Sequence, residues 1–309
     1  MNDFFSAIRN RDLPKVVSLL RDPHVNPAFN KNSAIRWAAK IGHLEMVTLL
    51  LRDPRVNPAD ENSDALLEAA EHGHLKIVSL LLQDPRVDPS AEDNDAMIEA
   101  AENGYLKIVS LLLHDPRVNP ADQDNYAIRF AAKNGHLEIV SLLLQDPRVN
   151  PAAEGNYAIE MAAMNGHLEI VSLLLQDPRV DPTASDNYAI RLASQFGQLE
   201  TVALLLKDSH VDPAAKNNEA VRLAAMNGYT ETVALLLRDL RVRRALPKPD
   251  SASKDPLARA LAEILTWNVS AQNTLTRHLE HAHRILAEYH LVSHILSYHP
   301  LTLPRRKRT

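Results

Sequence analysis

The sequence predicts an all-α solenoid of stacked helix pairs, and three periodic features carry that prediction. Eight aspartates recur at one constant interval, and most of them open the string Asp-Pro-Arg-Val-Asn/Asp-Pro. Seven of the eight glycines and thirteen of the nineteen prolines keep the same register. A fixed period of this kind is typical of repeat proteins, in which each unit packs on its neighbours. The aspartates are Asp22, Asp53, Asp84, Asp115, Asp146, Asp177, Asp208 and Asp239.

Each unit carries two short helical patterns separated by a turn. In the fourth unit we expect a first helix over 126–134, a turn at Gly135-His136 and a second helix over 137–145. Glycine tolerates left-handed dihedrals and ends helices, whereas the prolines of the Asp-Pro-x-Val-x-Pro segments indicate loops. The expected apolar stripes are Ala127, Ile128, Ala131 and Ala132 on the first helix, and Leu137, Val140, Leu143 and Leu144 on the second. Because so short a pair leaves its apolar face open, the units must stack.

The run Ala-Ala-x-x-Gly-His-Leu-Glu-Ile-Val-x-x-Leu-Leu occurs at 131–144 and again at 162–175. It closely resembles the ankyrin repeat over about three quarters of the chain, although that family's usual period, about 33 residues, is slightly longer. The Asp-Pro-Arg-Val variant resembles repeats of amoebae and of the large DNA viruses that infect them. Asp-Pro-Arg stands where the family has Gly-Ala-Asp, and Tyr-Ala-Ile-Arg where it has Thr-Pro-Leu-His, so the finger geometry stays open. The resemblance implies an ankyrin-type solenoid with short finger loops.

The period sets the expected domain boundaries. About eight helix pairs, the first one divergent, form an array over 1–242. A Pro/Ser/Lys-rich linker follows over 243–256. The region 257–309 is expected to be helical, with amphipathic segments at 257–267 and roughly 272–298. Two interpretations of this region stay open: a cap over the end of the array, or a docking or oligomerisation element.

Charge separates the array from the C-terminal region. From Arg241 onward the sequence has twelve Lys/Arg against five Asp/Glu, whereas the preceding residues have 22 against 34. The chain ends in a basic cluster that resembles a nuclear-import signal, and a solubilising terminus or nonspecific contact with nucleic acid are its alternatives. The cluster is Arg305, Arg306, Lys307 and Arg308.

Composition excludes several classes of site. The chain has no cysteine, which excludes disulfides, thiolate metal sites and cysteine nucleophiles. No signal-peptide pattern or long apolar run is present, so we expect a soluble intracellular protein, cytoplasmic or nuclear, without membrane contact. Glycines spaced a whole repeat apart form no phosphate-binding loop, and no catalytic triad is recognisable. We therefore predict no enzyme activity and no cofactor.

Histidine is the residue type that comes nearest to metal chemistry. Six of the fourteen histidines lie between His278 and His299, and His290 and His294 are four residues apart, as in a helical metal pair. The surrounding acidic residues form no zinc motif, so these histidines are interpreted as helix surface and no metal site is predicted. The histidines of the Gly-His turns, such as His136, are expected to bond the backbone between helices, as the resemblance implies.

In ankyrin proteins the partner usually lies on the concave face formed by finger tips and first helices. Positions there that differ between units are therefore candidates for partner binding. Asp64, Asp95 and four glutamates of the second and third units form an expected acidic patch, for which a solvated face is the alternative. Later apolar positions form an expected anchor, for which packing against neighbouring helices is the alternative. The candidates are Glu68, Glu71, Glu99, Glu102, Lys133, Met164, Phe196 and Met226.

These observations predict a noncatalytic protein-binding scaffold or adaptor. Its concave face would hold another protein, favouring a basic segment at the early units and an apolar one at the later units. A monomer is expected. The alternative is a nuclear regulatory protein that touches nucleic acid through its basic tail, a role for which the sequence offers no aromatic interleaving and no recognisable reading fold.

Overall fold

The computed structural model describes residues 2–245, and every regular element among them is an α-helix. Short turns join the two helices of a pair, and longer finger loops join one pair to the next. The helices are α1 (Asn2–Arg9), α2 (Leu13–Leu20), α3 (Phe29–Lys40), α4 (Leu44–Leu51), α5 (Asp60–Glu71), α6 (Leu75–Leu81), α7 (Ala91–Glu102), α8 (Leu106–Leu113), α9 (Asp122–Asn134), α10 (Leu137–Leu143), α11 (Ala153–Asn165), α12 (Leu168–Leu174), α13 (Ala184–Gln195), α14 (Leu199–Leu205), α15 (Ala215–Met226), α16 (Thr230–Leu236) and α17 (Leu240–Ala245).

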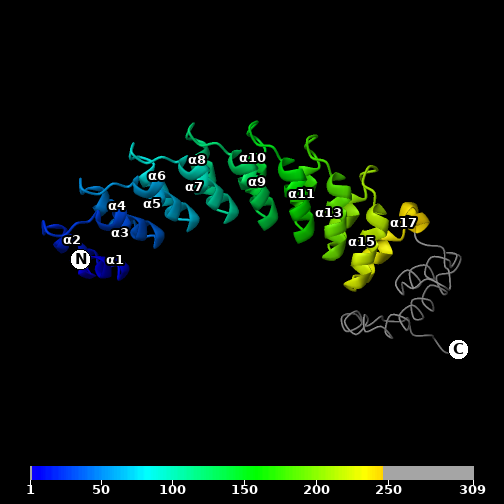
Figure 1. Cartoon of the computed structure of the whole chain (residues 1–309), viewed down its shortest axis with the longest axis horizontal. Coiled ribbons are helices and arrows are strands. Elements are labelled where there is room, and N and C mark those ends of the chain that lie inside the picture. The colour runs from blue at the N-terminus through cyan, green and yellow to red at the C-terminus, as the bar shows by residue number, and fades with distance from the viewer. Residues whose placement is uncertain (1, 246–309) are drawn as a thin grey trace, which may run out of the picture. The chain divides into compact units, whose positions relative to one another are not determined.

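The chain divides into two compact units, Met1–Ala158 and Ile159–Thr309. In the first unit, the first helices of successive pairs, α3, α5, α7 and α9, pack side by side, and the second helices α4, α6, α8 and α10 do the same. In the second unit α13 packs against α15, and α12, α14 and α16 follow one another. Within each unit the finger loops extend from the same side of the helix pairs (Figure 1). The predicted solenoid of stacked helix pairs is confirmed.

The core runs between the two helix layers of each unit. The stripe predicted for the first helix over 126–134 is confirmed on α9, where all four apolar positions are fully buried. On the second helix of that pair, Ile139, Val140 and Leu143 are buried, whereas Leu137 and Leu144 are only half-buried. The expected stripe was thus partly wrong, because α10 ends at Leu143 and Leu144 already belongs to the turn.

The Gly-His turns tie neighbouring pairs together. Gly42 has φ +74°, and a Cβ there would lie 2.5 Å from Cε1 of His74 in the next pair. The His74 Nε2 donates a hydrogen bond to the Lys40 carbonyl, at 2.9 Å, and His136 makes the same bond to the Glu102 carbonyl at 3.0 Å. These bonds confirm the predicted structural role of the turn histidines. Glycine is required because the neighbouring ring fills the space of a side chain.

The first helices from α3 to α15 each open with a left-handed turn that the sequence did not predict. Helix α9 begins at Asp122, four residues before the expected start at Tyr126, and Gln123, Asp124 and Asn125 have φ of 50°, 55° and 61°. The third residue of such turns is asparagine, or serine in one pair. Its side-chain oxygen accepts a backbone N–H from the following finger. Asparagine suits this position because it tolerates the left-handed region. The ladder positions are Asn32, Ser63, Asn94, Asn125, Asn156, Asn187 and Asn218.

The fingers carry an arginine clamp. Arg55 binds Asp53 through two hydrogen bonds, Nε to Oδ1 at 2.9 Å and Nη2 to Oδ2 at 2.7 Å, and its Nη1 donates to the Val25 carbonyl of the preceding finger at 2.9 Å. Arg86, Arg117, Arg148 and Arg241 make the corresponding bonds to the preceding valine carbonyls. The bond from arginine holds the pKa of each paired aspartate, such as Asp53, below its ordinary value. The repeated Asp-x-Arg string is therefore a coupling between units.

The two ends of the described array depart from the repeat. In the divergent first pair Arg11 replaces the glycine, takes φ 58° and donates through Nη2 to the Ile41 carbonyl at 2.8 Å. At the other end α17 continues three residues into the segment where the linker was expected. The expected C-terminal region, 257–309, lies outside the described residues.

Candidate functional site

In each unit the first helices pack side by side and form one face, which we call the inner face. On this face, side chains that are 28 residues apart in the sequence meet across neighbouring helices. From α3 to α5, the Arg36 Nη1 lies 2.5 Å from Asp64 Oδ2, and the Lys40 Nζ lies 2.8 Å from Glu68 Oε2. The Glu68 bond raises the pKa of Lys40 above its ordinary value. This register therefore pairs opposite charges at the first step of the face.

The second unit repeats this register. From α13 to α15, the Arg191 Nε lies 2.7 Å from Glu219 Oε2, at the same offset along the chain. The Arg191 guanidinium also lies over the Tyr188 ring, 5.0 Å from its centroid. Ion pairs at this offset thus recur between neighbouring first helices.

One step of the face breaks the pattern. From α5 to α7 the same offset places Leu67 opposite Asp95 and Glu71 opposite Glu99. Within residues 2–245, no lysine or arginine forms a salt bridge with Glu71, Asp95, Glu99 or Glu102. We call these four residues the acidic step. It is the place on the inner face of the first unit where the register assembles like charges.

The pKa of Glu99 reflects this crowding of carboxylates. Burial raises the pKa of Glu99 above its ordinary value, and the carboxylates of Glu102, Glu71 and Asp95 add to the rise. Asp95 accepts a hydrogen bond from the Gln123 Nε2 at 2.7 Å, and this donor carries no charge. The acidic step therefore favours an additional cation.

An aromatic and cationic cluster borders the acidic step on α9. Tyr126 and Phe130 stack with ring centroids 3.8 Å apart, and burial together with the Glu102 carboxylate raises the pKa of Tyr126. The Lys133 Nζ lies 4.8 Å from the Phe130 centroid, and the Arg129 guanidinium lies 5.6 Å from that of Tyr126. Lys133 is thus placed on the same face as the acidic step, with its ammonium group over an aromatic ring.

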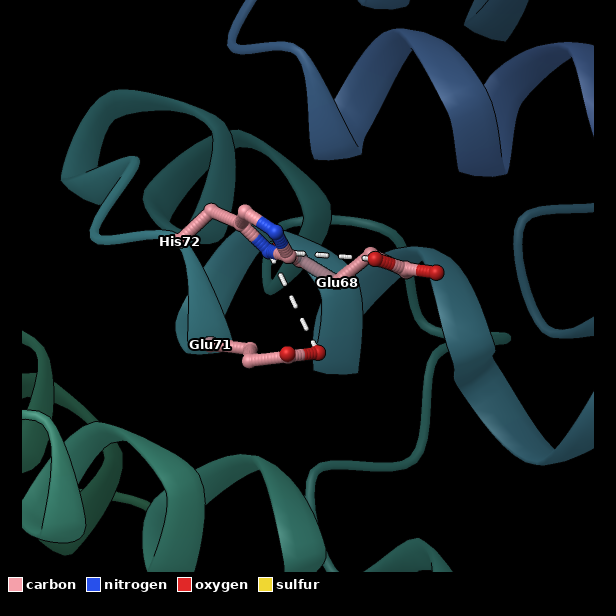
Figure 2. A group of neighbouring side chains, drawn as sticks. All are labelled: Glu68, Glu71 and His72. Atoms are coloured by element: carbon pink, nitrogen blue, oxygen red, sulfur yellow. Dashed lines mark hydrogen bonds and ion pairs between the residues drawn. The ribbon is translucent and has the colours of Figure 1, made fainter.

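Three side chains near the end of α5 could hold a metal ion. The donor atoms of Glu68, Glu71 and His72 all lie within 4.8 Å of one another, and Figure 2 shows a nitrogen of the His72 ring facing both glutamate side chains. The His72 Nδ1 lies 3.0 Å from the Glu68 carbonyl oxygen, to which only a protonated nitrogen can donate. The Lys40 ammonium already binds the Glu68 carboxylate. The nitrogen and the carboxylate thus have partners of their own, so this cluster is a weak metal site.

The apolar candidates lie on the first helices of the second unit and the turns after them. Phe196 is 44% exposed and Met226 is 53% exposed, whereas Met164 is half-buried. Phe196 and Met226 thus each leave about half of their side-chain surface accessible to a partner. Met164 retains both interpretations.

Sequence reasoning grouped the early carboxylates without distinguishing which of them are neutralised. Asp64 and Glu68 belong to ion pairs, whereas Glu71, Glu99 and Glu102 form no salt bridge with lysine or arginine within residues 2–245. Asp95 was part of the expected patch and proves to be part of the acidic step. The constant offset was present in the sequence as Arg36/Asp64, Lys40/Glu68 and Arg191/Glu219, and a search for opposite charges at one fixed separation would have found it.

Several predictions fall outside the described residues. They concern the basic cluster Arg305, Arg306, Lys307 and Arg308 and the histidines from His278 to His299. Among residues 2–245, no helix has the length and apolar character that crossing a lipid bilayer requires.

Comparison with known proteins agrees with this geometry. The family model described as ankyrin repeats (3 copies) matches residues 4–93 and 97–186. No curated protein gives a significant match to the chain. Since the matched segments cover more than half of the sequence and coincide with the stacked helix pairs, the chain belongs to the ankyrin-repeat family.

Proposed function

We propose that this chain is a noncatalytic scaffold whose acidic step binds a basic segment of another protein. Ankyrin repeats typically bind other proteins, and an all-helical repeat array is typically a scaffold rather than an enzyme. The observation that carries the proposal is the change of charge pattern between α5 and α7, where Glu71 stands opposite Glu99, whereas Lys40 stands opposite Glu68 one step earlier.

A lysine or arginine side chain from a partner would supply a compensating charge. It would take the place that Lys40 takes toward Glu68 one helix earlier. Such a contact is partly withdrawn from water, so it stabilises the complex more than an ion pair at an exposed rim would.

Phe196 and Met226 are proposed as a second contact, formed by apolar side chains in the other unit. Exposed large apolar residues at successive positions of a binding face are typical anchors of protein interfaces. Lys133 and Met164 remain proposed contacts of lower exposure.

The test is a pull-down from a cell extract with charge-reversed arrays. One variant changes Glu71, Glu99 and Glu102 to Lys. Its control changes three exposed glutamates on second helices to Lys, so that both have the same net charge. We expect partners to be lost with the first variant and retained with the control. A further variant, Phe196→Ser with Met226→Ser, tests the apolar contact. If the inner-face variant and the control variant recover partner proteins equally, the acidic step does not bind them. The control residues are Glu45, Glu138 and Glu169.

A further inference from the structure

The last described pair, α15 and α16, has the sequence of an internal unit rather than of an end unit. An end unit normally turns a polar surface to water, because nothing packs on its outer side. Here the second helix keeps the apolar Thr-Val-Ala-Leu-Leu run of its predecessor. The exposed fractions of the side chains on α15 and α16 show which positions of this pair remain uncovered.

Two positions change from buried to half-buried at the last pair. The valine of each second helix from the second pair to the seventh is 0% exposed, whereas its equivalent Val233 is half-buried. The second alanine of the Ala-Ala motif, or the serine that replaces it, is also 0% exposed in those pairs, whereas Ala225 is half-buried. The buried equivalents are Val47, Val78, Val109, Val140, Val171 and Val202, and Ala39, Ala70, Ala101, Ala132, Ala163 and Ser194.

In the same pair, a buried polar atom near the start of α15 lacks the partner that its equivalents have. In the earlier turns the ladder side chain accepts a backbone N–H of the following finger, as Asn187 does from Asp212 at 2.6 Å. The corresponding residue for Asn218 is Arg243, whose N–H donates instead to the Asp239 carbonyl. Asn218 is 2% exposed, and its Oδ1 has no hydrogen-bond partner within residues 2–245. A buried acceptor without a partner costs about 1 to 3 kcal/mol.

We propose that residues 257–267 of this chain cover the end face at which Ala225 and Val233 are left half-buried. Their apolar residues follow the spacing i, i+3, i+4, i+7 and i+8, which gives one continuous stripe on a helix. This is the pattern that an array helix presents to its neighbour. The stripe consists of Leu257, Ala260, Leu261, Ile264 and Leu265.

The position of the chain favours this segment over other occupants. The described residues end at Ala245 in α17, which packs against α15 itself. The residues 246–256 can extend over about 35 Å, which exceeds the length of a helix pair in the array. The contact is intramolecular, so it acts at a high effective concentration that a separate molecule does not have. The end face contains no residue of the acidic step, so this proposal stands independently of the proposed function.

Hydrogen exchange of the full chain tests the proposal. One variant changes Leu261→Asp and Ile264→Asp in the apolar stripe, and the control changes Ala262→Asp and Thr266→Asp on the opposite side of the same segment. We expect amides of α15 and α16 to exchange about tenfold faster in the first variant and within about twofold of the unchanged chain in the control. Equal exchange in the two variants would overturn the proposal.

Two further measurements exclude other occupants. Light scattering of the unchanged chain is expected to give a mass near 34.4 kDa; a dimer that the stripe variant converts to monomer would assign the end face to a second copy and contradict the proposal. Because the chain has no cysteine, Val233→Cys and Leu261→Cys can be combined without background. We expect a disulfide within one chain under mild oxidation, and failure to form it also contradicts the proposal.

Discussion

Single side chains at the ladder positions join the start of a first helix to the following finger. Asn94 is buried at φ 69°, its Oδ1 accepts the N–H of Asn119 at 3.0 Å, and its Nδ2 donates to Asp122. One side chain thus satisfies a backbone group of the next finger and the carboxylate that opens the next helix. Ser63 makes only the first of these bonds, to the N–H of Asp88 at 2.9 Å.

We therefore expect Asn94→Ala to destabilise the protein by about 2 kcal/mol, because it leaves the Asn119 N–H buried without a partner and places alanine in the left-handed region. Asn94→Ser should cost less than half as much, since a serine does this work at position 63. Urea denaturation of the two variants measures the difference. Equal destabilisation by Ala and Ser would show that the side-chain acceptor is unimportant.

The carboxylate of Glu99 is expected to cost stability at neutral pH. Its folded-state pKa is raised above the unfolded value of about 4.3, so the folded protein holds that proton more tightly. The cost is absent below the unfolded pKa and is complete once the pH has risen through the folded pKa. Glu99→Gln should accordingly stabilise by about 0.5 kcal/mol at pH 7 and lose this advantage as the pH falls.

Thermal unfolding of Glu99→Gln between pH 4 and pH 7 measures this effect. The control is Glu138→Gln on the second helix α10, where the side chain is exposed. A stabilisation that is the same at both pH values, or one that the control shares, would contradict the assignment of crowding to the acidic step.

At the scale of elements, the finger clamps decide how strongly neighbouring pairs are coupled. Most described fingers carry an arginine bonded to a preceding valine carbonyl, whereas His210 stands at this position in another. His210 binds Asp208 of its own finger, and within residues 2–245 it makes no bond to Val180. The coupling at this finger is therefore weaker than at the others.

His210→Arg is expected to restore the clamp and to stabilise the protein by about 1 kcal/mol, the usual contribution of a hydrogen bond to a charged donor at a partly exposed site. The reverse change, Arg86→His, should destabilise by a similar amount. Chemical denaturation of both variants checks the pair. If His210→Arg leaves the unfolding midpoint unchanged while Arg86→His lowers it, the clamp at position 210 is prevented by another feature of that finger.

The elements also show how far the sequence determines the fold. The helix pairs, the glycine turns and the bonds of the turn histidines were predictable, because periodicity and the resemblance place them. The left-handed turn at the start of the first helices from α3 to α15 was not, since successive residues with positive φ, nearly all of them other than glycine, contradict local propensity. The ion pairs of the inner face were likewise missed because they join residues of different units.

The same reason explains what sequence reasoning achieved for the candidate site. It singled out the early carboxylates as candidates, but Glu68 and Glu71 are equivalent as residue types and differ only in what lies opposite. Phe196 and Met226 were singled out because apolar residues stood where polar ones were expected, and they stay proposed contacts with exposed side chains.

At the scale of the whole molecule, the distribution of charge bears on how the protein binds a partner. The net charge of −5 combines an acidic array with a basic C-terminal sequence. Net charge influences association with many partners, whereas the acidic step is proposed to bind one cationic side chain at a defined position. A binding experiment must therefore separate the local effect from the overall charge.

Selection of random peptides displayed on phage against the full chain tests this claim most directly. We expect the selected peptides to be enriched in lysine or arginine, and we expect Glu71→Lys with Glu99→Lys to abolish this enrichment. Exposed Glu138→Lys with Glu169→Lys, which changes the net charge equally, should leave the enrichment intact. Selected peptides that are not enriched in lysine or arginine would contradict the proposed role of the acidic step. An equal loss of this enrichment in the two double variants would contradict it as well.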